Sequence, residues 1–259
     1  MKILYLDCKL GVAGDMLMAS LLGLIDDKDH FITKMNELFP QAIINYQSVT
    51  RHNINGIKIN IEIEGEMEIC EDVAYDESSL SSQMLACIDN SEKIDILKFI
   101  LALSLKVNVK EQALQIYHSL KMAENIVHNK KLTYIHNSKI GSLDAVIDIV
   151  GSCLLLEIIK PDKIISSPIN VGSGKVKYNS KIFNVPAPAT AQLVSGIPHF
   201  SGEINAELAT PTGVVMIREV TDEFMQDFRD DDFLWHYGIG GKKFHIPTYT
   251  AACLVLRSN

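Results

Sequence analysis

One segment, Gly141–Ile159, limits the folds that are open to the rest of the chain. It is almost continuously apolar, with Asp144 and Asp148 near its start and Glu157 near its end. A helix that is apolar on all sides has to be buried on all sides, so we expect a central helix packed between other layers. Its most apolar part, 145–159, is shorter than the roughly 20 residues that cross a bilayer. The segment therefore predicts a core helix, and we expect no membrane partner.

Strand and helix patterns alternate around this segment. Strict apolar–polar alternation in 57–64 indicates a half-exposed strand, paired with 43–49 through a turn near Asn53–Gly56. A helical segment is expected around 79–127. The other expected strands are 3–6, 163–169 and 251–256, and the other expected helices are 16–24, 30–38, 187–194 and 211–224. Such alternation predicts an α/β fold, a mixed sheet flanked by helices, as one domain over 1–259.

Charge and cysteine usage narrow the class of partner and the compartment. The chain has 24 Lys and Arg against 32 Asp and Glu, a formal net charge of −8. Nucleic acids and anionic membranes need a basic footprint, so we expect neither as the main partner, although a small anion remains compatible with local donors. Residues 1–10 lack a signal-peptide pattern, and the five cysteines show no C-x-x-C pair. A cytoplasmic protein without a disulfide framework is expected.

Four carboxylates are candidates for chemistry. Asp144 and Asp148 are four residues apart and share a helix face, where burial is costly unless they are paired, bonded to backbone or holding a cation. Asp7 ends the first strand, where ligands bind in open α/β sheets, and Asp15 opens the next helix. The alternatives are a core ion pair for Asp148 and helix caps for Asp144 and Asp15. Cys8 is a candidate soft ligand or a small core residue.

Two segments are candidates for anion binding. Gly172-Ser173-Gly174-Lys175 is not a P-loop, because Ile169 and Val176 occupy positions where that motif needs Gly and Ser or Thr. A loop of this kind can still hold a phosphate through backbone N–H groups and one lysine. Thr210-Pro211-Thr212-Gly213 begins a predicted helix, whose N-terminus attracts anions, with a plain cap as the alternative. Among the histidines, His136 precedes the core helix, and each one alone is more typical of a surface residue.

Together these motifs resemble the LarC nickel-insertion family in order and spacing, over nearly the whole chain. The residues that carry the resemblance are Leu6-Asp7-Cys8, Gly11–Met16, Gly141–Gly151, Ser167-Pro168, Val171–Gly174, Val185–Thr190, Thr210–Gly213 and Tyr237–Gly240. The resemblance implies an N-terminal LarC-like domain, with a helical insertion over 79–140. It also implies that a second, CTP-associated domain of longer members lies outside this sequence.

The resemblance implies a nickel chelatase or cyclometallase of the lyase class. Such a protein inserts nickel into pyridinium-3,5-bisthiocarboxylic acid mononucleotide, forming one metal–carbon and two metal–sulfur bonds with CTP required. The product is the nickel-pincer cofactor of lactate racemase-type enzymes. The residues expected to hold nickel are Asp7, Asp15, His136, Asp144 and Asp148, with Asp144 or Asp148 as the base. The residues expected to seat the nucleotide phosphate are Gly172, Ser173, Gly174, Lys175, Thr210, Thr212 and Gly213.

Two departures from the family pattern keep a second hypothesis open. Residues 62–77 are acidic and lack the family's histidines, and His136-Asn137-Ser138-Lys139 stands where the family has H-x-H-E. The alternative is a nickel- or precursor-binding module without turnover that acts with a separately encoded C-terminal half. A third hypothesis is a folded but degenerate product with no site. The chain is also compatible with a homo-oligomer.

Overall fold

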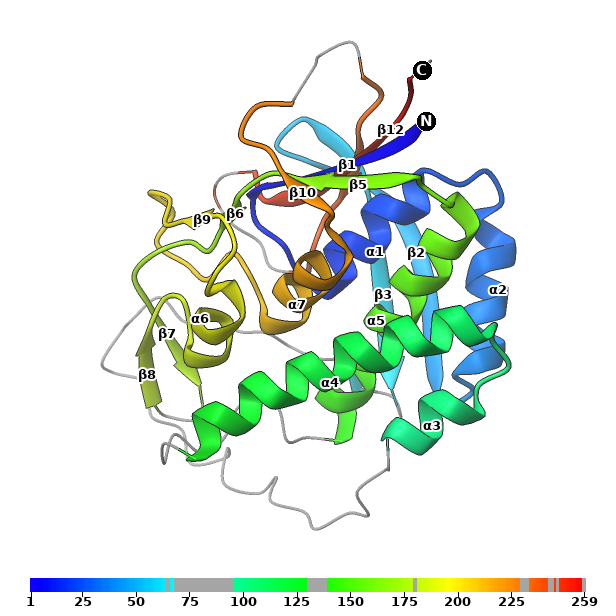
Figure 1. Cartoon of the computed structure of the whole chain (residues 1–259), viewed down its shortest axis with the longest axis horizontal. Coiled ribbons are helices and arrows are strands. Elements are labelled where there is room, and N and C mark those ends of the chain that lie inside the picture. The colour runs from blue at the N-terminus through cyan, green and yellow to red at the C-terminus, as the bar shows by residue number, and fades with distance from the viewer. Residues whose placement is uncertain are drawn as a thin grey trace.

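The structure is a computed structural model that describes residues 1–63, 66–67, 96–129, 139–178, 181–228, 233–241, 245 and 247–257. Its main feature is an eight-stranded mixed sheet with the order β10-β5-β1-β12-β11-β3-β2, in which β4 also pairs with β3 (Figure 1). The strands are β1 Lys2–Leu10, β2 Ala42–Arg51, β3 Ile54–Ile63, β4 Glu66–Met67, β5 Lys163–Ser166, β10 Glu223–Phe224, β11 His236–Gly238 and β12 Tyr249–Leu256. The predicted α/β class is confirmed.

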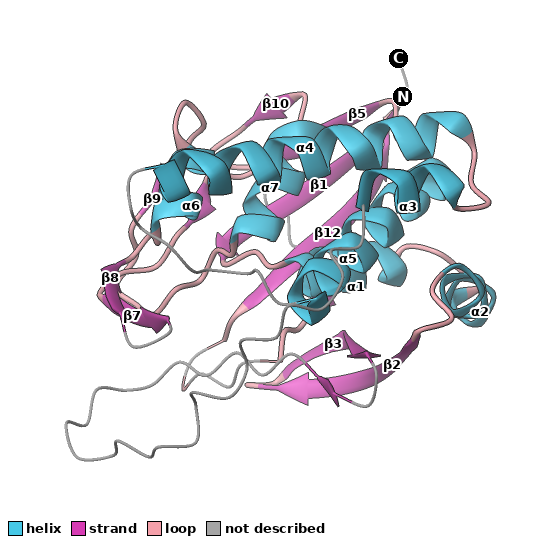
Figure 2. Ribbon diagram, turned by 90° about the horizontal axis from the view of Figure 1, so that it is seen from below, coloured by secondary structure: helices cyan, strands magenta, loops and turns pink. Residues whose placement is uncertain are grey.

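Helices cover one face of this sheet (Figure 2). The helices are α1 Gly14–Gly23, α2 Lys28–Leu38, α3 Ile96–Ala102, α4 Val107–Asn129, α5 Lys139–Ile159, α6 Pro188–Val194 and α7 Pro211–Val220. α1 packs against β3, β11, β12 and α5, while α4 packs against α5, α6 and α7. Two small sheets lie beside them, β6 Ile169–Asn170 with β9 His199–Phe200, and β7 Lys175–Tyr178 with β8 Lys181–Asn184. No helix in the described ranges is long and apolar enough to cross a membrane.

The apolar segment is the core helix that its composition predicts. In α5 the side chains of Val146, Ile147, Ile149 and Val150 are fully buried, although they point in different directions around the helix. Such burial on several sides requires neighbours on several sides, and α1, α4 and α7 supply them. Burying a side chain of this size contributes about 1.5–3 kcal/mol relative to leaving it exposed, so α5 is a main source of stability.

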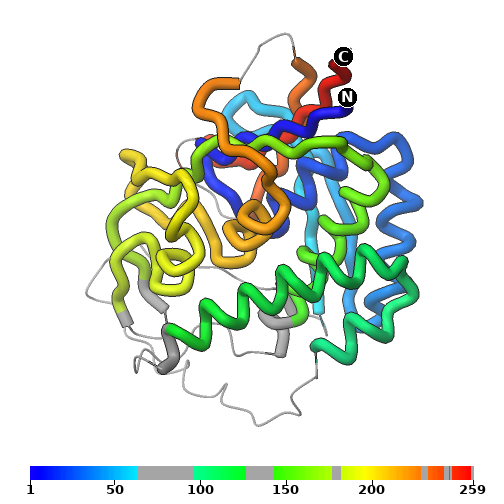
Figure 3. Tube along the Cα trace, in the orientation of Figure 1, coloured from blue at the N-terminus to red at the C-terminus, as the bar shows by residue number. Residues whose placement is uncertain are grey.

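The other face of the sheet carries a smaller aromatic core. Strand β1 alternates between the two faces, because Leu4, Leu6 and Cys8 belong to the helix-covered core while Ile3 and Tyr5 belong to the second cluster. The Tyr5 ring lies 4.8 Å from the ring of Phe228, and the second cluster also contains Trp235, Tyr249 and Cys253. The chain ends also pair: the Met1 ammonium donates to the Arg257 carbonyl at 2.8 Å (Figure 3).

Several predicted boundaries differ from the structure. The first strand, predicted over 3–6, extends over Lys2–Leu10, so Asp7 lies within it and not at its end. The predicted strand 163–169 is two strands in different sheets, interrupted at Ser167 and Pro168, because proline has no N–H for a ladder. The predicted helix 211–224 ends at Val220. Asp222 bonds the chain after α7 to β5. Its N–H donates to the Ile164 carbonyl at 2.9 Å, and its carboxylate accepts from the Ile164 N–H at 2.8 Å. The hairpin turn lies at His52–Asn53, before the predicted 53–56.

Candidate functional site

The carboxyl ends of parallel strands meet at one edge of the sheet. β1 is parallel to β5, and β5 is parallel to β10. At this edge Ser166 and Ser167 are fully buried, and the Ser167 hydroxyl accepts from the Cys8 N–H at 2.8 Å. Buried hydroxyls in an apolar core are costly unless they are hydrogen-bonded. Ligands in open α/β sheets bind outside this edge, so the position is the expected place for a site.

The loop after β1, the loop after β6 and the start of α7 carry motifs that are far apart in the sequence. These motif segments all contact one extended stretch, residues 206–210. The Val12 N–H donates to the Leu208 carbonyl at 2.9 Å, and the Thr210 N–H donates back to the Val12 carbonyl at 2.9 Å. On its other side the Leu208 N–H donates to the Val171 carbonyl at 3.2 Å. The stretch therefore joins the loop after β1 to the loop after β6 and to the start of α7.

Glycines allow these close approaches. A Cβ on Gly213 would lie 2.6 Å from the Val12 carbonyl oxygen, and a Cβ on Gly172 would lie 1.9 Å from the Ala206 carbonyl oxygen. Gly172 also has a φ of +84°, a conformation that other residues adopt only with strain. Both positions therefore need glycine in order to keep the segments in contact.

Most backbone donors of the two candidate anion segments are already used within the chain. The Gly172 N–H donates to Asn170 Oδ1 at 3.0 Å, and the Ser173 N–H donates to the Ile204 and Ala206 carbonyls at 3.0 and 3.2 Å. The Gly213 N–H donates to the Thr210 hydroxyl at 3.2 Å, as a helix cap does. Lys175, at the start of β7, is exposed. The anion-binding role stays a prediction, and the groups best able to serve it are the Lys175 ammonium and the Thr212 end of α7.

Asp148 lies against the start of α1. Its side chain is 4% exposed, and its Oδ2 would be 2.1 Å from a Cβ placed on Gly14, the first residue of that helix. A helix N-terminus favours a negative charge, because its dipole and first N–H groups point outward there. Asp144 lies one turn earlier on the same helix and is partly exposed. The two carboxylates of α5 thus differ in access to solvent.

The other predicted nickel ligands do not all lie beside Asp148 and the start of α1. Asp15 is partly exposed; its Oδ1 accepts from the Met16 N–H at 2.8 Å, and its Oδ2 would be 3.7 Å from a Cβ on Gly240. Asp7 is 2% exposed and accepts from the Lys9 N–H at 3.0 Å. The alternation of β1 places Asp7 on the aromatic face, opposite α5.

No preformed metal cluster appears in the described part of the chain. Within it, no three His, Cys, Asp or Glu side chains lie close enough together to hold a metal ion. His136 lies outside the described residues. The assignment of Asp7, Asp15, His136, Asp144 and Asp148 as nickel ligands therefore stays a prediction.

Cys8 is poorly suited to be a thiolate ligand as it stands. Its side chain is fully buried, and burial raises the pKa of the Cys8 thiol from 9.0 to about 12, although a hydrogen bond with Ser166 opposes this shift. The thiolate is the form that binds metal ions and reacts with electrophiles. Burial thus favours the alternative in which Cys8 is a small core residue.

In the native state we expect Cys8 to resist alkylation by iodoacetamide near pH 8, because both the deprotonated form and access to it are suppressed. Mass-spectrometric peptide mapping before and after unfolding in urea measures this. The unfolded chain serves as the control, since there the same thiol is exposed and should react fully. Rapid labelling of Cys8 in the folded chain would contradict the assignment.

Three residues at this edge were missed by sequence reasoning. Glu207 is 3% exposed within the stretch 206–210. The sequence pattern that could have identified Glu207 is a single charge between apolar residues just before the Thr210–Gly213 motif. Asn170 bonds three backbone groups, among them the Lys9 carbonyl at 3.0 Å, and Thr250 donates to the Gly11 carbonyl at 3.0 Å. Neither Asn170 nor Thr250 has a sequence signal, because their partners are distant along the chain.

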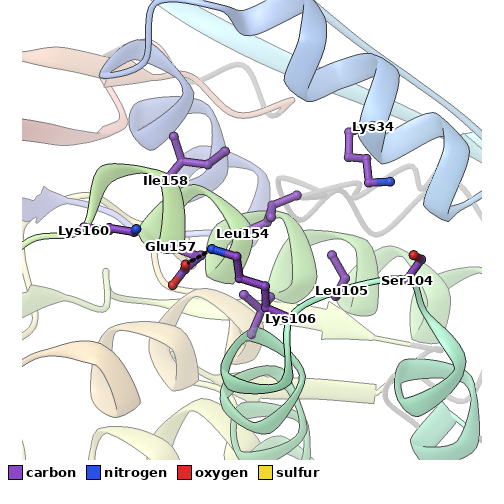
Figure 4. A pocket seen from close by; sticks show the side chains of 9 residues that line it. Lys34, Ser104, Leu105, Lys106, Leu154, Glu157, Ile158 and Lys160 are labelled. Atoms are coloured by element: carbon purple, nitrogen blue, oxygen red, sulfur yellow. Dashed lines mark hydrogen bonds and ion pairs between the residues drawn. The ribbon is translucent and has the colours of Figure 1, made fainter.

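A cavity of about 350 Å³ lies elsewhere, at the C-terminal end of α5 (Figure 4). Glu157 lines it and accepts from the Lys106 ammonium at 2.6 Å and from the Asn108 amide at 2.7 Å. These bonds, with the nearby charges of Lys106 and Lys160, hold the pKa of Glu157 below its usual value. The C-terminal end of α5 leads into the start of β5. The cavity is therefore at the amino ends of the parallel strands, away from the motif segments.

Comparison with known proteins places these motif segments in one family. The family described as "Nickel insertion protein" matches residues 4–257. A protein of Staphylococcus saprophyticus named pyridinium-3,5-bisthiocarboxylic acid mononucleotide nickel insertion protein is 32% identical over 250 residues, covering 96% of this chain and 59% of the relative. Proteins with the same name from Clostridium kluyveri and Acetivibrio thermocellus are 30% and 33% identical, covering 95% and 86% of this chain and 60% and 53% of their own lengths. The chain thus spans a little over half the length of these relatives. No solved structure matches it.

Proposed function

Because the chain belongs to the nickel insertion family, we propose that it takes part in inserting nickel into pyridinium-3,5-bisthiocarboxylic acid mononucleotide, the compound in its relatives' name. Nickel and the mononucleotide are both substrates in this proposal. As the resemblance to the LarC family implies, we assign the CTP requirement to the CTP-associated second domain of longer members. The proposed reaction class is a nickel chelatase or cyclometallase, a lyase, acting in the cytoplasm.

The observation that carries the proposal is the convergence of the motif segments around the start of α1. Asp148 contacts Gly14, Val12 is bonded to both Leu208 and Thr210, and Gly213 packs on Val12. A carboxylate pair on α5 and the capped N-terminus of α7 are thereby joined through one short loop. In this proposal Asp144 is the base on one side, and Lys175 and the Thr212 end of α7 seat the phosphate on the other.

Asp144 is the better candidate for the base at the ring carbon. A general base has to reach the proton that it removes, and Asp144 is partly exposed whereas Asp148 is buried. In the step the ring C–H bond breaks, its electron pair forms the nickel–carbon bond, and the proton passes to the carboxylate. Asp148, held at the start of α1, serves in this proposal to fix the helix turn that carries Asp144.

The substrate itself reduces the number of protein ligands that nickel needs. The product contains two metal–sulfur bonds and one metal–carbon bond, so the mononucleotide supplies most of the donors. Soft sulfur also suits nickel better than carboxylate oxygen does. A protein site with few carboxylates, which releases nickel easily, is consistent with this transfer.

A reconstituted assay tests the proposal. The purified chain is incubated with the mononucleotide, nickel and CTP, with the C-terminal part of the Staphylococcus saprophyticus relative added separately. Mass spectrometry of the small-molecule fraction should then show the nickel-containing product. The full-length relative is the positive control, and the added C-terminal part alone is the negative control. No product above that negative control, with an active positive control, would overturn the proposal.

A second candidate function is a binding module without turnover. It is favoured by His136-Asn137-Ser138-Lys139, which stands where the family has H-x-H-E, so that one histidine and the glutamate are replaced. Equilibrium dialysis against nickel, with and without the mononucleotide, separates the two functions. Retention of nickel or mononucleotide without product in the reconstituted assay supports the binding module.

A further inference from the structure

Strand β2 ends the main sheet on one side and is open along part of its length. It pairs only with β3 among the described strands, in one regular register from Ala42↔Ile63 to Arg51↔Ile54. Natural edge strands are protected by charges, proline, bulges or a cover, because unpaired N–H and C=O groups otherwise recruit another strand. In β2 the sequence AIINYQSVTR has no proline and a single charge, at Arg51.

The hairpin turn determines which groups of β2 face outward. His52 and Asn53 form the two-residue connection and have φ values of 50° and 62°. Two left-handed residues are the signature of a type I′ hairpin turn, whose flanking residues form a hydrogen-bonded pair. Arg51 therefore bonds to Ile54 on β3. Because the bonding direction alternates along a strand, every second residue back from Arg51 also faces β3, and those between face outward.

The side chain of Asn36 on α2 confirms this direction independently. Its amide donates to the Ile44 carbonyl at 2.8 Å and its Oδ1 accepts from the Ile44 N–H at 2.9 Å. Asn36 thus occupies the place where a further strand would bond, so the backbone groups of Ile44 face outward. The Ala42 N–H is also used, by the Phe39 carbonyl at 2.9 Å. The first part of the edge is covered by α2.

The second part of the edge is not covered by the described part of the chain. There, the outward N–H and C=O groups belong to Tyr46, Ser48 and Thr50, and no hydrogen bond from another described residue reaches them. Ser48 and Thr50 are exposed and Tyr46 is half-buried. An open edge of this length, uncharged and free of bulges, is a template for a further strand.

We propose that a second copy of this chain pairs with β2, antiparallel and two-fold symmetric, through residues 46–50. In this register Ser48 lies opposite the partner's Ser48, and Tyr46 lies opposite the partner's Thr50. All three outward-facing residues then form hydrogen-bonded pairs, since opposite residues of an antiparallel ladder exchange both bonds when their groups face each other. The inference stands apart from the proposed nickel chemistry.

The limits of the open stretch favour a copy of this chain as the occupant. One end stops at Ile44, which Asn36 covers, and the other end stops at the hairpin turn His52–Asn53. Under two-fold symmetry the partner's turn falls beside Ile44, so the incoming strand ends where the cover begins. Shifting the register by two residues loses one of the three pairs. No like charges meet, because Arg51 lies opposite the partner's Asn45.

The test is the association state of the whole chain and of Ser48→Pro. Analytical ultracentrifugation over a concentration series should show a dimer for the wild type. Ser48→Pro removes the central outward N–H while leaving the bonds to β3, and should weaken association at least tenfold. Ser48→Ala keeps that N–H and should dimerise as the wild type does. Circular dichroism of Ser48→Pro checks that the variant is folded.

Amide exchange of the wild type tests the proposed pairing even where Ser48→Pro fails to fold. Amide exchange of the wild type, resolved by NMR, should show slow exchange at Asn45, Gln47 and Val49 at every concentration. Exchange at Tyr46, Ser48 and Thr50 should become slow only as the dimer forms. A monomer at all concentrations, a dimer unaffected by a folded Ser48→Pro variant, or a dimer in which these three amides stay fast would each overturn the proposal.

Discussion

Gly14→Ala is expected to lower the free energy of unfolding by about 1–3 kcal/mol, although alanine is the better helix former. A Cβ at this position would lie 2.1 Å from Oδ2, 2.7 Å from Cγ and 2.8 Å from Cβ of Asp148. These atoms belong to a short buried side chain on the core helix α5, so relief requires α1 and α5 to move apart. On propensity alone the substitution in α1 would stabilise by about 1 kcal/mol, and the expected effect has the opposite sign.

Gly151→Ala is the matched control for this prediction. It lies at the same α1–α5 contact, and a Cβ there would lie 2.2 Å from Met18 Sδ. Because methionine is long and flexible, Met18 can move away, and a smaller loss is expected. In urea unfolding, the double variant Gly14→Ala/Asp148→Ala should recover part of the loss, since the two nearest Asp148 atoms are removed. A Gly14→Ala variant as stable as the wild type would refute the described contact.

Asp144→Asn is expected to slow nickel insertion by about 10²- to 10⁴-fold, the usual contribution of a general base. The amide has nearly the shape of the carboxylate but cannot accept the ring proton. The measurement is the initial rate of product formation in the reconstituted assay, at saturating nickel and mononucleotide. Stability should change little, since Asp144 is partly exposed.

Glu157→Gln is the matched control, because Glu157 is a carboxylate on the same helix at the end away from the motif segments. The substitution removes the charge that pairs with Lys106 at the protein surface, where such pairs contribute little to stability, and should leave the insertion rate unchanged. Equal rates for Asp144→Asn and the wild type would remove Asp144 from the mechanism. They would leave the family assignment intact.

Local patterns predicted the elements whose burial follows a regular pattern along the chain. The continuous apolar run of α5, the period-two alternation of β3 and the Gly11–Asp15 turn into α1 each depend on near neighbours, and each element is present in the structure. Predictions failed where a distant residue intervened. The bonds of Asp222 to Ile164 end α7 early and turn the following residues into β10.

The candidate site, too, could be predicted only in part from the sequence. Residue types and order pointed to Asp144, Asp148, Asp7 and the glycine segments, and the resemblance to the LarC family is confirmed by the family match over 4–257. Sequence spacing could not show that Asp7 is on the aromatic face while Asp148 is on the helix face, nor that Glu207 is buried beside Gly172. The structure also shows that the N–H groups of Gly172 and Ser173 are already bonded.

The order and types of the residues were thus enough to predict the fold class, the core helix and the family. The folded chain was needed to show that Asp7 and Asp148 lie on different faces of the sheet, that the Gly172 and Ser173 N–H groups are already bonded, and that part of β2 is an open edge. The physical reason is range: helix and strand periodicity follow from neighbours a few residues apart. Whether a backbone group already has a hydrogen-bond partner, and which residues a side chain packs against, depend on segments more than 100 residues away. The Cys8 N–H and Ser167 are one such pair, and Gly14 and Asp148 are another.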